Sequence, residues 1–347
     1  MKRLNYLRIV FLLVASPAWL WAQSREEAMK LLGSKDYRAA AEAFRAVVTG
    51  NDGKPEDYVY LVNSYLYSNN GAAALEWSNR ALNQYTNHAQ FIALRGRAHY
   101  LNCNIRSAIA DASAAALLST NDTVFYDLAY YYSHVDSHSL AIEAANKISA
   151  SSDYAFAALN IKGIAKSELG DMKGAKKEFK EALLRCRNEQ DKALLYCNMG
   201  KVEYYKGNKN TAIDYYAKAI KADSTFTKGY IDRGYVKRET GFYNEAQADF
   251  QRAIELLKTN CTTCGDYCEW QNDFYMGVAY GHLEDFENSA IAFDKAIAMR
   301  PCEGEIYYFR GWTKGLALGF IASCSDWQKA EELGYKYARK YREEYCK

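Results

Sequence analysis

The chain is poor in proline, in long apolar runs and in charge of one sign. Only three prolines occur among 347 residues, at positions 17, 55 and 301, so little in the sequence interrupts a helix. Lys and Arg number 44 against 42 Asp and Glu, and this balance argues against a nucleic-acid binder that relies on bulk charge. No segment reaches the roughly 18 consecutive apolar residues that a membrane-spanning helix needs. The abundant Ala and the 30 Tyr instead favour long arrays of helix.

Motifs that carry catalysis are also missing from the sequence. It contains no phosphate-cradling glycine loop, no G-x-S-x-G and no H-E-x-x-H. His134 and His138 have the i, i+4 spacing of a helical metal pair, but the segment HVDSH is expected to be an exposed polar turn. Paired acids such as Glu331 and Glu332 read as solvated helix surface. We therefore predict a protein that is not an enzyme and that uses no metal and no cofactor.

Residues 1–22 are typical of an export signal. A basic start is followed by the apolar run of residues 9–15, by Ser16 and Pro17, and by the small residue Ala22 before a polar stretch. We expect cleavage after Ala22. No cysteine follows the apolar run, so lipid attachment is not indicated. The prediction is an exported protein, periplasmic or secreted, without a membrane span.

Small residues recur along the chain at spacings of 33 to 37 residues, with one of 43. The ladder consists of Ala40, Ala74, Ala108, Ala141, Ala175, Ala212, Ala246, Ser289 and Ser323. Twelve residues before each member lies a second small or apolar residue: Ala28, Val62, Gly96, Ala129, Gly163, Gly200, Gly234, Gly277 and Gly311. Four residues after the ladder position, six units carry an aromatic: Phe44, Phe179, Tyr216, Phe250, Phe293 and Trp327.

This pattern predicts nine helical hairpins. Two antiparallel helices approach closely only where side chains are small, and a bulky ring fills the groove beside the contact. One hairpin cannot bury its apolar face alone, so neighbours must stack into a continuous core. We predict an all-α fold, an α-solenoid of stacked antiparallel hairpins, with nine repeats over residues 23–334 and a capping helix over 335–347. The two longest spacings place insertions in surface loops near residues 187–190 and 258–268.

The units resemble tetratricopeptide repeats, above all in residues 200–223 (GKVEYYKGNKNTAIDYYAKAIKAD), 234–256 and 277–301. The resemblance covers nearly all of the chain after residue 22, although several units lack the early Gly or the later aromatic. It implies a right-handed superhelix whose first helices line a concave groove that binds peptides or proteins. Placed on that template, the groove residues are Arg97, Tyr100, Tyr126, Tyr130, Asn160, Lys201, Tyr204, Lys228, Tyr235, Arg238, Phe274, Tyr308 and Trp312.

One subclass of the family grips carboxyl-terminal Asp or Glu of chaperone tails with Lys, Asn and Arg side chains. Asn198 and Lys228 occupy two of the matching positions, but Asn160 and Ile164 replace a Lys and an Asn, and Asp232 replaces the Arg. An acid facing a carboxylate is repulsive. The comparison therefore disfavours this kind of ligand.

Two functions remain from the sequence. The first is a non-catalytic adaptor that holds a protein or an extended peptide in its groove, within an envelope or secretion complex. The alternative is a glycan-binding or envelope-assembly surface protein whose groove aromatics stack on sugar rings. Aromatic and Arg side chains suit either function, since they are common binding anchors.

Nine cysteines follow the signal, and an exported chain can form disulfides with them. Cys324 and Cys346 are the best pair, because a hairpin turning at Gly334 sets them side by side. The cluster Cys261, Cys264 and Cys268 is expected in a loop, where disulfides, one of them reaching Cys302, are favoured over a zinc site. Cys186 and Cys197 flank a turn and are a further possible pair, and Cys103 is the best candidate for an unpaired thiol.

Overall fold

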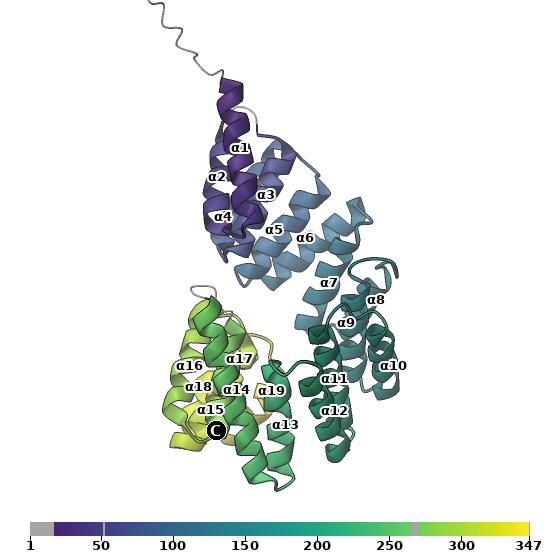
Figure 1. The fold of residues 1–347 in the computed structure, drawn as a ribbon, viewed down its shortest axis with the longest axis vertical. Helices are drawn as coiled ribbons and strands as arrows, with labels where there is room; N and C mark the ends of the chain where they lie inside the picture. The colour runs from purple at the N-terminus through teal and green to yellow at the C-terminus, as the bar shows by residue number, and fades with distance from the viewer. Residues whose placement is uncertain (1–16, 51–52, 265–269, 347) are drawn as a thin grey trace, which may run out of the picture. The chain divides into compact units, whose positions relative to one another are not determined.

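Figure 1 shows the computed structural model, which describes residues 17–50, 53–264 and 270–346. Every regular element in these ranges is a helix, which confirms the all-α prediction. The chain divides into two compact units, residues 1–124 (unit 1) and 125–347 (unit 2). None of the described helices is long and apolar enough to cross a membrane.

Unit 1 consists of consecutive antiparallel hairpins whose helices pack in chain order. Its helices are α1 (Pro17–Gly33), α2 (Tyr37–Thr49), α3 (Pro55–Tyr67), α4 (Gly71–Gln84), α5 (Ala89–Leu101) and α6 (Ile105–Leu118). α7 (Asp122–His134) begins at its end. The expected cleavage point after Ala22 falls within α1, and residues 1–16 lie outside the described part of the chain.

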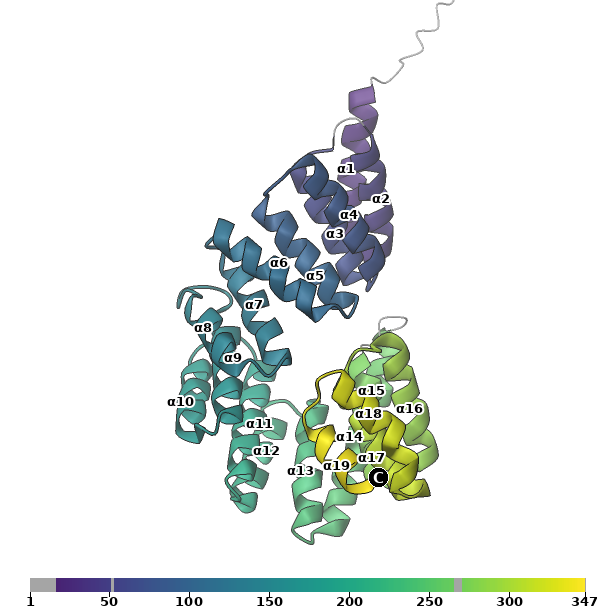
Figure 2. The ribbon, with the colours of Figure 1, turned by 180° about the vertical axis from the view of Figure 1, so that it is seen from behind.

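Unit 2 continues the same arrangement, as the reverse view in Figure 2 shows. After α7 its helices are α8 (His138–Asn146), α9 (Ala155–Glu168), α10 (Met172–Leu183), α11 (Glu189–Tyr205), α12 (Lys209–Ala222), α13 (Thr227–Glu239), α14 (Tyr243–Cys264), α15 (Trp270–His282), α16 (Phe286–Met299), α17 (Gly304–Leu318), α18 (Cys324–Glu332) and α19 (Tyr337–Tyr345). A short 3₁₀ helix, Phe320–Ser323, precedes α18. Through α18 the odd-numbered helices are the first helices of their hairpins.

A repeated turn joins the two helices of most hairpins. One residue adopts the left-handed conformation, for example Gly170 with φ 83° and Gly207 with φ 82°, where glycine meets no Cβ penalty. An Asp or Asn follows as the N-cap of the second helix. The side chain of Asp171, for instance, accepts a hydrogen bond from the backbone N–H of Gly174 at 2.8 Å. The sequence therefore fixes where each second helix begins.

All nine ladder positions are buried, with at most 2% of any residue exposed. The early glycines lie against the rings that follow sixteen residues later: a Cβ on Gly200 would lie 2.7 Å from Cε1 of Tyr216, and one on Gly277 would lie 2.8 Å from Phe293. The absent side chain is therefore what makes room for the ring.

Three hairpins lack the aromatic, and they differ at the partner position. Val62 accompanies Ser78 in the second hairpin, and Ala129 accompanies Ala145 in the fourth, and all four residues are at most 2% exposed. In the third hairpin both positions are small, because Gly96 accompanies Ala112. A larger residue therefore replaces the early glycine in two of the three hairpins that lack the ring.

From the third hairpin on, ion pairs that join a basic residue of the first helix to an acid of the second occur in alternate hairpins, a pattern that the spacing of small residues does not reveal. Arg233 binds Asp249 with two hydrogen bonds of 2.9 and 2.6 Å, and Lys237 adds a third at 2.9 Å. The same geometry joins Arg95 to Asp111 and Arg310 to Asp326, with Lys162 and Lys166 on Glu178 as a variant. The intervening hairpins place Leu128, Met199 or Met276 at the position of the arginine. The ion-pair pattern therefore repeats every second hairpin, whereas the pattern of small residues repeats in every hairpin.

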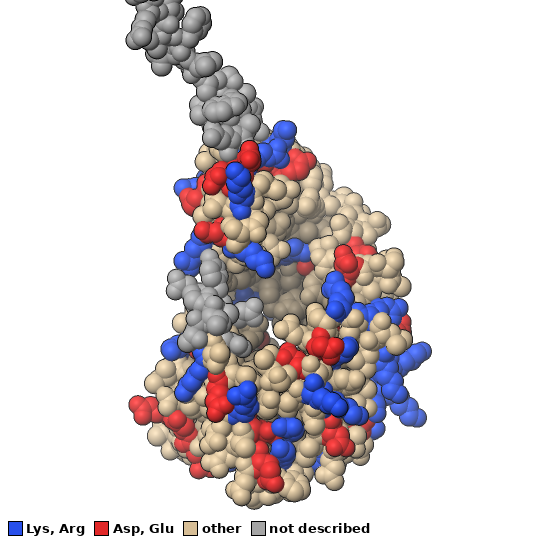
Figure 3. All heavy atoms as spheres, in the orientation of Figure 1, with Lys and Arg blue, Asp and Glu red and all other residues tan. Residues whose placement is uncertain are grey.

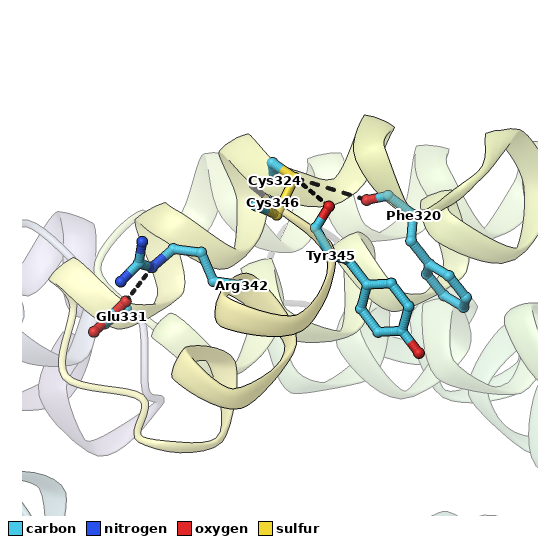
Figure 4. Close-up of a disulfide and its surroundings, with 6 residues drawn as sticks. All are labelled: Phe320, Cys324, Glu331, Arg342, Tyr345 and Cys346. Atoms are coloured by element: carbon cyan, nitrogen blue, oxygen red, sulfur yellow. Dashed lines mark hydrogen bonds and ion pairs between the residues drawn. A yellow bond between two sulfur atoms is a disulfide. The ribbon is translucent and has the colours of Figure 1, made fainter.

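The last helix, α19, covers the end of the array. Its Ala338 is fully buried, and Tyr341 and Tyr345 pack on Trp327, with ring centroids 5.4 and 6.0 Å away. Cys324 and Cys346 are joined by a disulfide that ties the two ends of this hairpin together, as Figure 4 shows. Beside it, Arg342 donates to Glu331 at 2.5 Å.

Several cysteine predictions are wrong. Cys186 and Cys197 are free thiols and do not pair with each other, and Cys103, expected to be unpaired, is disulfide-bonded, as is Cys302. Cys261 and Cys264 belong to the last turns of α14 and not to a loop, because no Gly or Pro interrupts the helix before Gly265. Cys268 lies outside the described residues.

Candidate protein-interaction groove

A cavity of about 400 Å³ lies within unit 2 on the side of the first helices. All but one of its lining residues come from α9, α11, α13, α15 and α17, the labelled first helices of five consecutive hairpins in Figure 2. We call this cavity the groove. It is lined by Ile164, Ser167, Glu168, Phe179, Leu194, Asn198, Lys201, Val202, Lys228, Ile231, Asp232, Phe274, Tyr275, Val278, Glu305 and Phe309.

One helical stripe supplies most of this lining. On α11 it consists of Leu194, Asn198 and Lys201, which are four and three residues apart and therefore share a face. The equivalent positions are Lys228 and Asp232 on α13, and Glu305 and Phe309 on α17. Repetition of the hairpin thus aligns chemically different side chains along one surface.

The apolar part of the groove is aromatic and aliphatic. Phe274 meets Phe309 edge to face, with centroids 5.5 Å apart, and Phe293 at 6.1 Å. Ile231 and Val278 are buried beside them. These contacts hold the rings in place from both sides, so the surface is formed before any ligand arrives.

The lysines that line the groove are paired with acids. Lys228 donates to Oδ2 of Asp232 at 2.5 Å, and the thiol of Cys197 donates to the same oxygen at 3.0 Å. Lys201 lies 3.6 Å from Glu168. Burial, followed by the charge of Asp232, raises the pKa of the Cys197 thiol well above its usual range, so this cysteine is a hydrogen-bond donor and not a nucleophile.

Glu168 also binds the C-terminal hairpin. Lys336 donates to its Oε2 at 2.9 Å, and the hydroxyl of Tyr337 donates to the same atom at 3.2 Å. Burial acts to raise the pKa of Glu168, but the hydrogen bond from Lys336 and the nearby lysine charges bring it below the usual value. The residues just before α19 and at its start therefore contact the groove through Glu168.

Glu305 differs from the other charged residues of the groove. No hydrogen bond or ion pair engages its carboxylate among the described residues. Burial, and next the charge of Glu303, raise its pKa. The groove therefore contains one acid that has no polar partner in the described part of the chain.

Only some of the residues predicted for the groove line it in the structure. Lys201, Lys228 and Phe274 line the groove. Asn160 lies beside it, where its side-chain oxygen accepts a hydrogen bond from Asn198 at 2.8 Å. This contact engages the amide of Asn198, which the chaperone-tail clamp would need for its ligand, and it agrees with the sequence argument against that ligand.

Four other predicted residues form a row near the C-terminal ends of the first helices. The ring of Tyr204 meets that of Tyr235 at 5.7 Å, Tyr235 meets His282 at 5.7 Å, and His282 meets Trp312 at 5.1 Å. Arg238 donates to the backbone carbonyl of His282 at 3.3 Å. Burial, and then the charge of Arg238, lower the pKa of His282 to about 3. These rings pack on one another across successive hairpins.

The remaining predicted residues serve other contacts. Tyr126 and Tyr130 on α7 stack at 6.1 Å, and Tyr130 also meets His134 at 4.2 Å. Tyr308 packs on Tyr341 of α19 at 5.6 Å. Arg97 and Tyr100 belong to unit 1, where both are half-buried on α5.

His138 also departs from expectation. It begins α8 and is 8% exposed, so the predicted exposed turn holds only for the residues between the two histidines. His134 ends α7, and its Nδ1 lies 2.8 Å from the carbonyl oxygen of Tyr130. Among the described residues, no group of three or more His, Cys, Asp or Glu is arranged to hold a metal ion.

Sequence reasoning missed Tyr275, Glu305 and Phe309 as groove residues. Their signal is present, because they lie two or six residues before an early small residue, as Asn198 and Leu194 do. The groove positions taken from the tetratricopeptide-repeat template lie at other distances from the early small residues, so they did not include these three residues. On the face drawn in Figure 3, basic and acidic side chains are interspersed, so the surface charge there does not point to the groove.

Comparison with known proteins gives one family match and several similar folds. Residues 193–226 match the tetratricopeptide repeat family. A stretch of 91 residues is 33% identical to DnaJ homolog subfamily C member 7 of Homo sapiens, covering 26% of this chain and 18% of that protein. The chain therefore spans less than a fifth of this relative.

Two solved structures share the fold over almost the whole chain. One is a Rap protein complexed with Competence and Sporulation Factor, at 14% identity, covering 94% of this chain and all of that one, with a TM-score of 0.54. The other is the apo form of the quorum sensor NprR from B. thuringiensis, at 16% identity, covering 90% and 98%, with a TM-score of 0.53. At these identities the similarity concerns the fold alone.

Proposed function

We propose that this chain, in which residues 193–226 match the tetratricopeptide repeat family, is a non-catalytic interaction scaffold that holds an extended peptide or a protein segment in the groove of unit 2. The carrying observation is the cavity of about 400 Å³ lined by the first helices of five successive hairpins. A lining shared by five hairpins suits an elongated ligand better than a compact metabolite.

The composition of the groove supports a peptide. An aromatic and aliphatic wall lies beside Asn198, Tyr275 and several charged side chains, and a peptide offers both apolar side chains and backbone groups for hydrogen bonds. The Rap protein with a similar fold carries a bound factor. Stacking on sugars requires aromatic faces free of neighbours, whereas Tyr204 and Tyr235 pack on each other. The peptide function is therefore favoured over the glycan function.

The N-terminal signal and the disulfides support a place outside the cytosol. The segment of residues 1–22 has the order of an export signal, and the bond between Cys324 and Cys346 suits an oxidising compartment. We propose that the chain acts in the periplasm, or after secretion, as part of an envelope or secretion complex.

The first prediction concerns groove recognition. A Lys201→Ala/Tyr275→Ala variant removes one charge and one ring from the wall, and we expect it to lose most partners that the intact protein retains. Its matched control is Lys221→Ala/Tyr243→Ala, which changes the same residue types at exposed positions on the second helices α12 and α14.

The measurement is affinity capture of the oxidised protein from its native envelope, with retained proteins identified by mass spectrometry. Circular dichroism must show equal helix content in both variants. Equal retention of partners by the groove variant and the control would place recognition elsewhere and contradict the proposal.

A further inference from the structure

The charges in the groove are unevenly compensated. Lys228 is held by Asp232 and Lys201 by Glu168, so neither lysine is a free anion-binding group. Glu168 is in turn bonded to Lys336 and Tyr337. Within the described part of unit 2, Glu305 is the lining acid without a hydrogen bond or ion pair.

Glu305 is placed where a ligand can reach it. It is the second residue of α17, half-buried, and it lines the cavity together with Phe309 one turn later. Its location in the first turn lets the helix dipole stabilise the unpaired charge in the absence of a ligand. That helix end explains how the acid is tolerated, but it does not explain why the side chain lines an open cavity among aromatic residues.

The groove geometry points to a basic peptide side chain as the occupant beside Glu305. We propose that the groove recognises peptides in which a Lys or Arg lies next to a bulky apolar residue, with the cation on Glu305 and the apolar side chain on Phe274 and Phe309. This inference rests on the proposed peptide-binding function and specifies its ligand.

Three physical arguments favour a cation over an anion. The uncompensated charge at the site is that of Glu305, and it would repel a carboxylate of the ligand. The rings of Tyr275 and Phe309 line the same cavity, and aromatic faces attract cations. The aliphatic stem of Lys or Arg can cover Val278 and Ile231 while its charged end reaches an acid.

The test uses a random heptapeptide library displayed on phage and selected on the full-length, oxidised protein. We expect selected sequences to be enriched in Lys or Arg adjacent to an apolar residue. The same selection on Glu305→Gln should lose the basic enrichment and keep the apolar one, and Glu305→Lys should shift the enrichment toward Asp and Glu. Glu255→Gln, an exposed acid on α14, should leave the selection unchanged.

Affinity measurements on one selected peptide complete the test. Calorimetry should show about tenfold weaker binding when Lys in the peptide is replaced by norleucine, and the same loss for the original peptide on Glu305→Gln. Combining both changes should cost little beyond either one. Additive losses, or selected peptides without basic residues, would overturn the inference but leave peptide binding in place. If no peptide is enriched on the wild-type protein, the inference and the proposed function both fail.

Discussion

At the residue scale, several hairpins pair a helical glycine with an aromatic ring sixteen residues later. Gly200 leaves room for Tyr216, which is only 3% exposed, whereas the fourth hairpin has Ala129 and Ala145 at these two positions. A glycine inside a helix costs about 1 kcal/mol relative to alanine. Glycine is nevertheless present at position 200, where the ring of Tyr216 lies against the helix backbone.

The second prediction is that Gly200→Ala destabilises the protein by about 1–3 kcal/mol, despite the better helix propensity of Ala. The new Cβ would lie 2.7 Å from the buried ring of Tyr216, and that ring has no space to retreat. The measurement is the midpoint of urea unfolding.

Two variants test the cause. Gly33→Ala, where a Cβ meets nothing within 4 Å, should be neutral or stabilising. Gly200→Ala combined with Tyr216→Ala recreates the pair found in the fourth hairpin, and it should lose less than the sum of the single changes. A strictly additive double variant would show that the clash is not the cause.

Glu203 is a second residue whose effect can be measured. Its side chain is 3% exposed and accepts hydrogen bonds from Lys176 at 2.7 Å, Asn208 at 2.7 Å and Lys206 at 3.3 Å. Burial acts to raise the pKa of this carboxyl, but these hydrogen bonds lower it to about 2. Because the folded pKa lies below the unfolded one, the charged form stabilises the fold at neutral pH.

The third prediction follows from the direction of that shift. The stabilisation is fully present above about pH 4.5 and is lost as pH falls from there toward 2. At pH 7, Glu203→Gln should cost roughly 2–3 kcal/mol of unfolding free energy, and the gap between wild type and variant should close as the pH approaches 2. A gap that stays constant between pH 7 and pH 2.5 in denaturant titrations would contradict this assignment.

At the element scale, the C-terminal hairpin both covers the core and contacts a residue of the groove. α19 packs through Ala338, Tyr341 and Tyr345, while Lys336 and Tyr337 reach Glu168 on α9, 168 and 169 residues away in the sequence. The disulfide closes a separation of 22 residues. For a loop of this size, chain entropy alone predicts about 3 kcal/mol of stabilisation.

The fourth prediction is therefore local. Changing Cys324→Ser and Cys346→Ser together should speed amide hydrogen exchange in residues 337–345, and leave α11 and α12 near their wild-type rates. The readout is exchange mass spectrometry of the oxidised proteins, without reductant, so that the other disulfides stay intact. Unchanged exchange in α19 would show that packing on Trp327 alone holds this helix.

At the scale of the whole molecule, the repeat organisation was predictable and the binding surface was only partly so. The residues of the ladder from Ala40 to Ser323 are all buried, because close helix contacts demand small residues at fixed spacing. Predicting the groove requires three further kinds of information. These are which first helices face one cavity, which charged side chains neutralise each other, and where the C-terminal helix packs. Lys201 and Lys228 were found, but only the structure shows that acids neutralise both.

The sequence by itself determined the all-α class and the positions of the buried small residues, because these depend on interactions between helices that are close together in the chain. It left the cysteines underdetermined, since nine thiols allow many pairings and only the fold sets distances between them. It also placed Tyr308 in the groove and missed Glu305. The tertiary structure separates them: α19 packs on Tyr308, whereas no other side chain pairs with the Glu305 carboxylate among the described residues. Long-range packing, which repeat spacing does not encode, makes that difference.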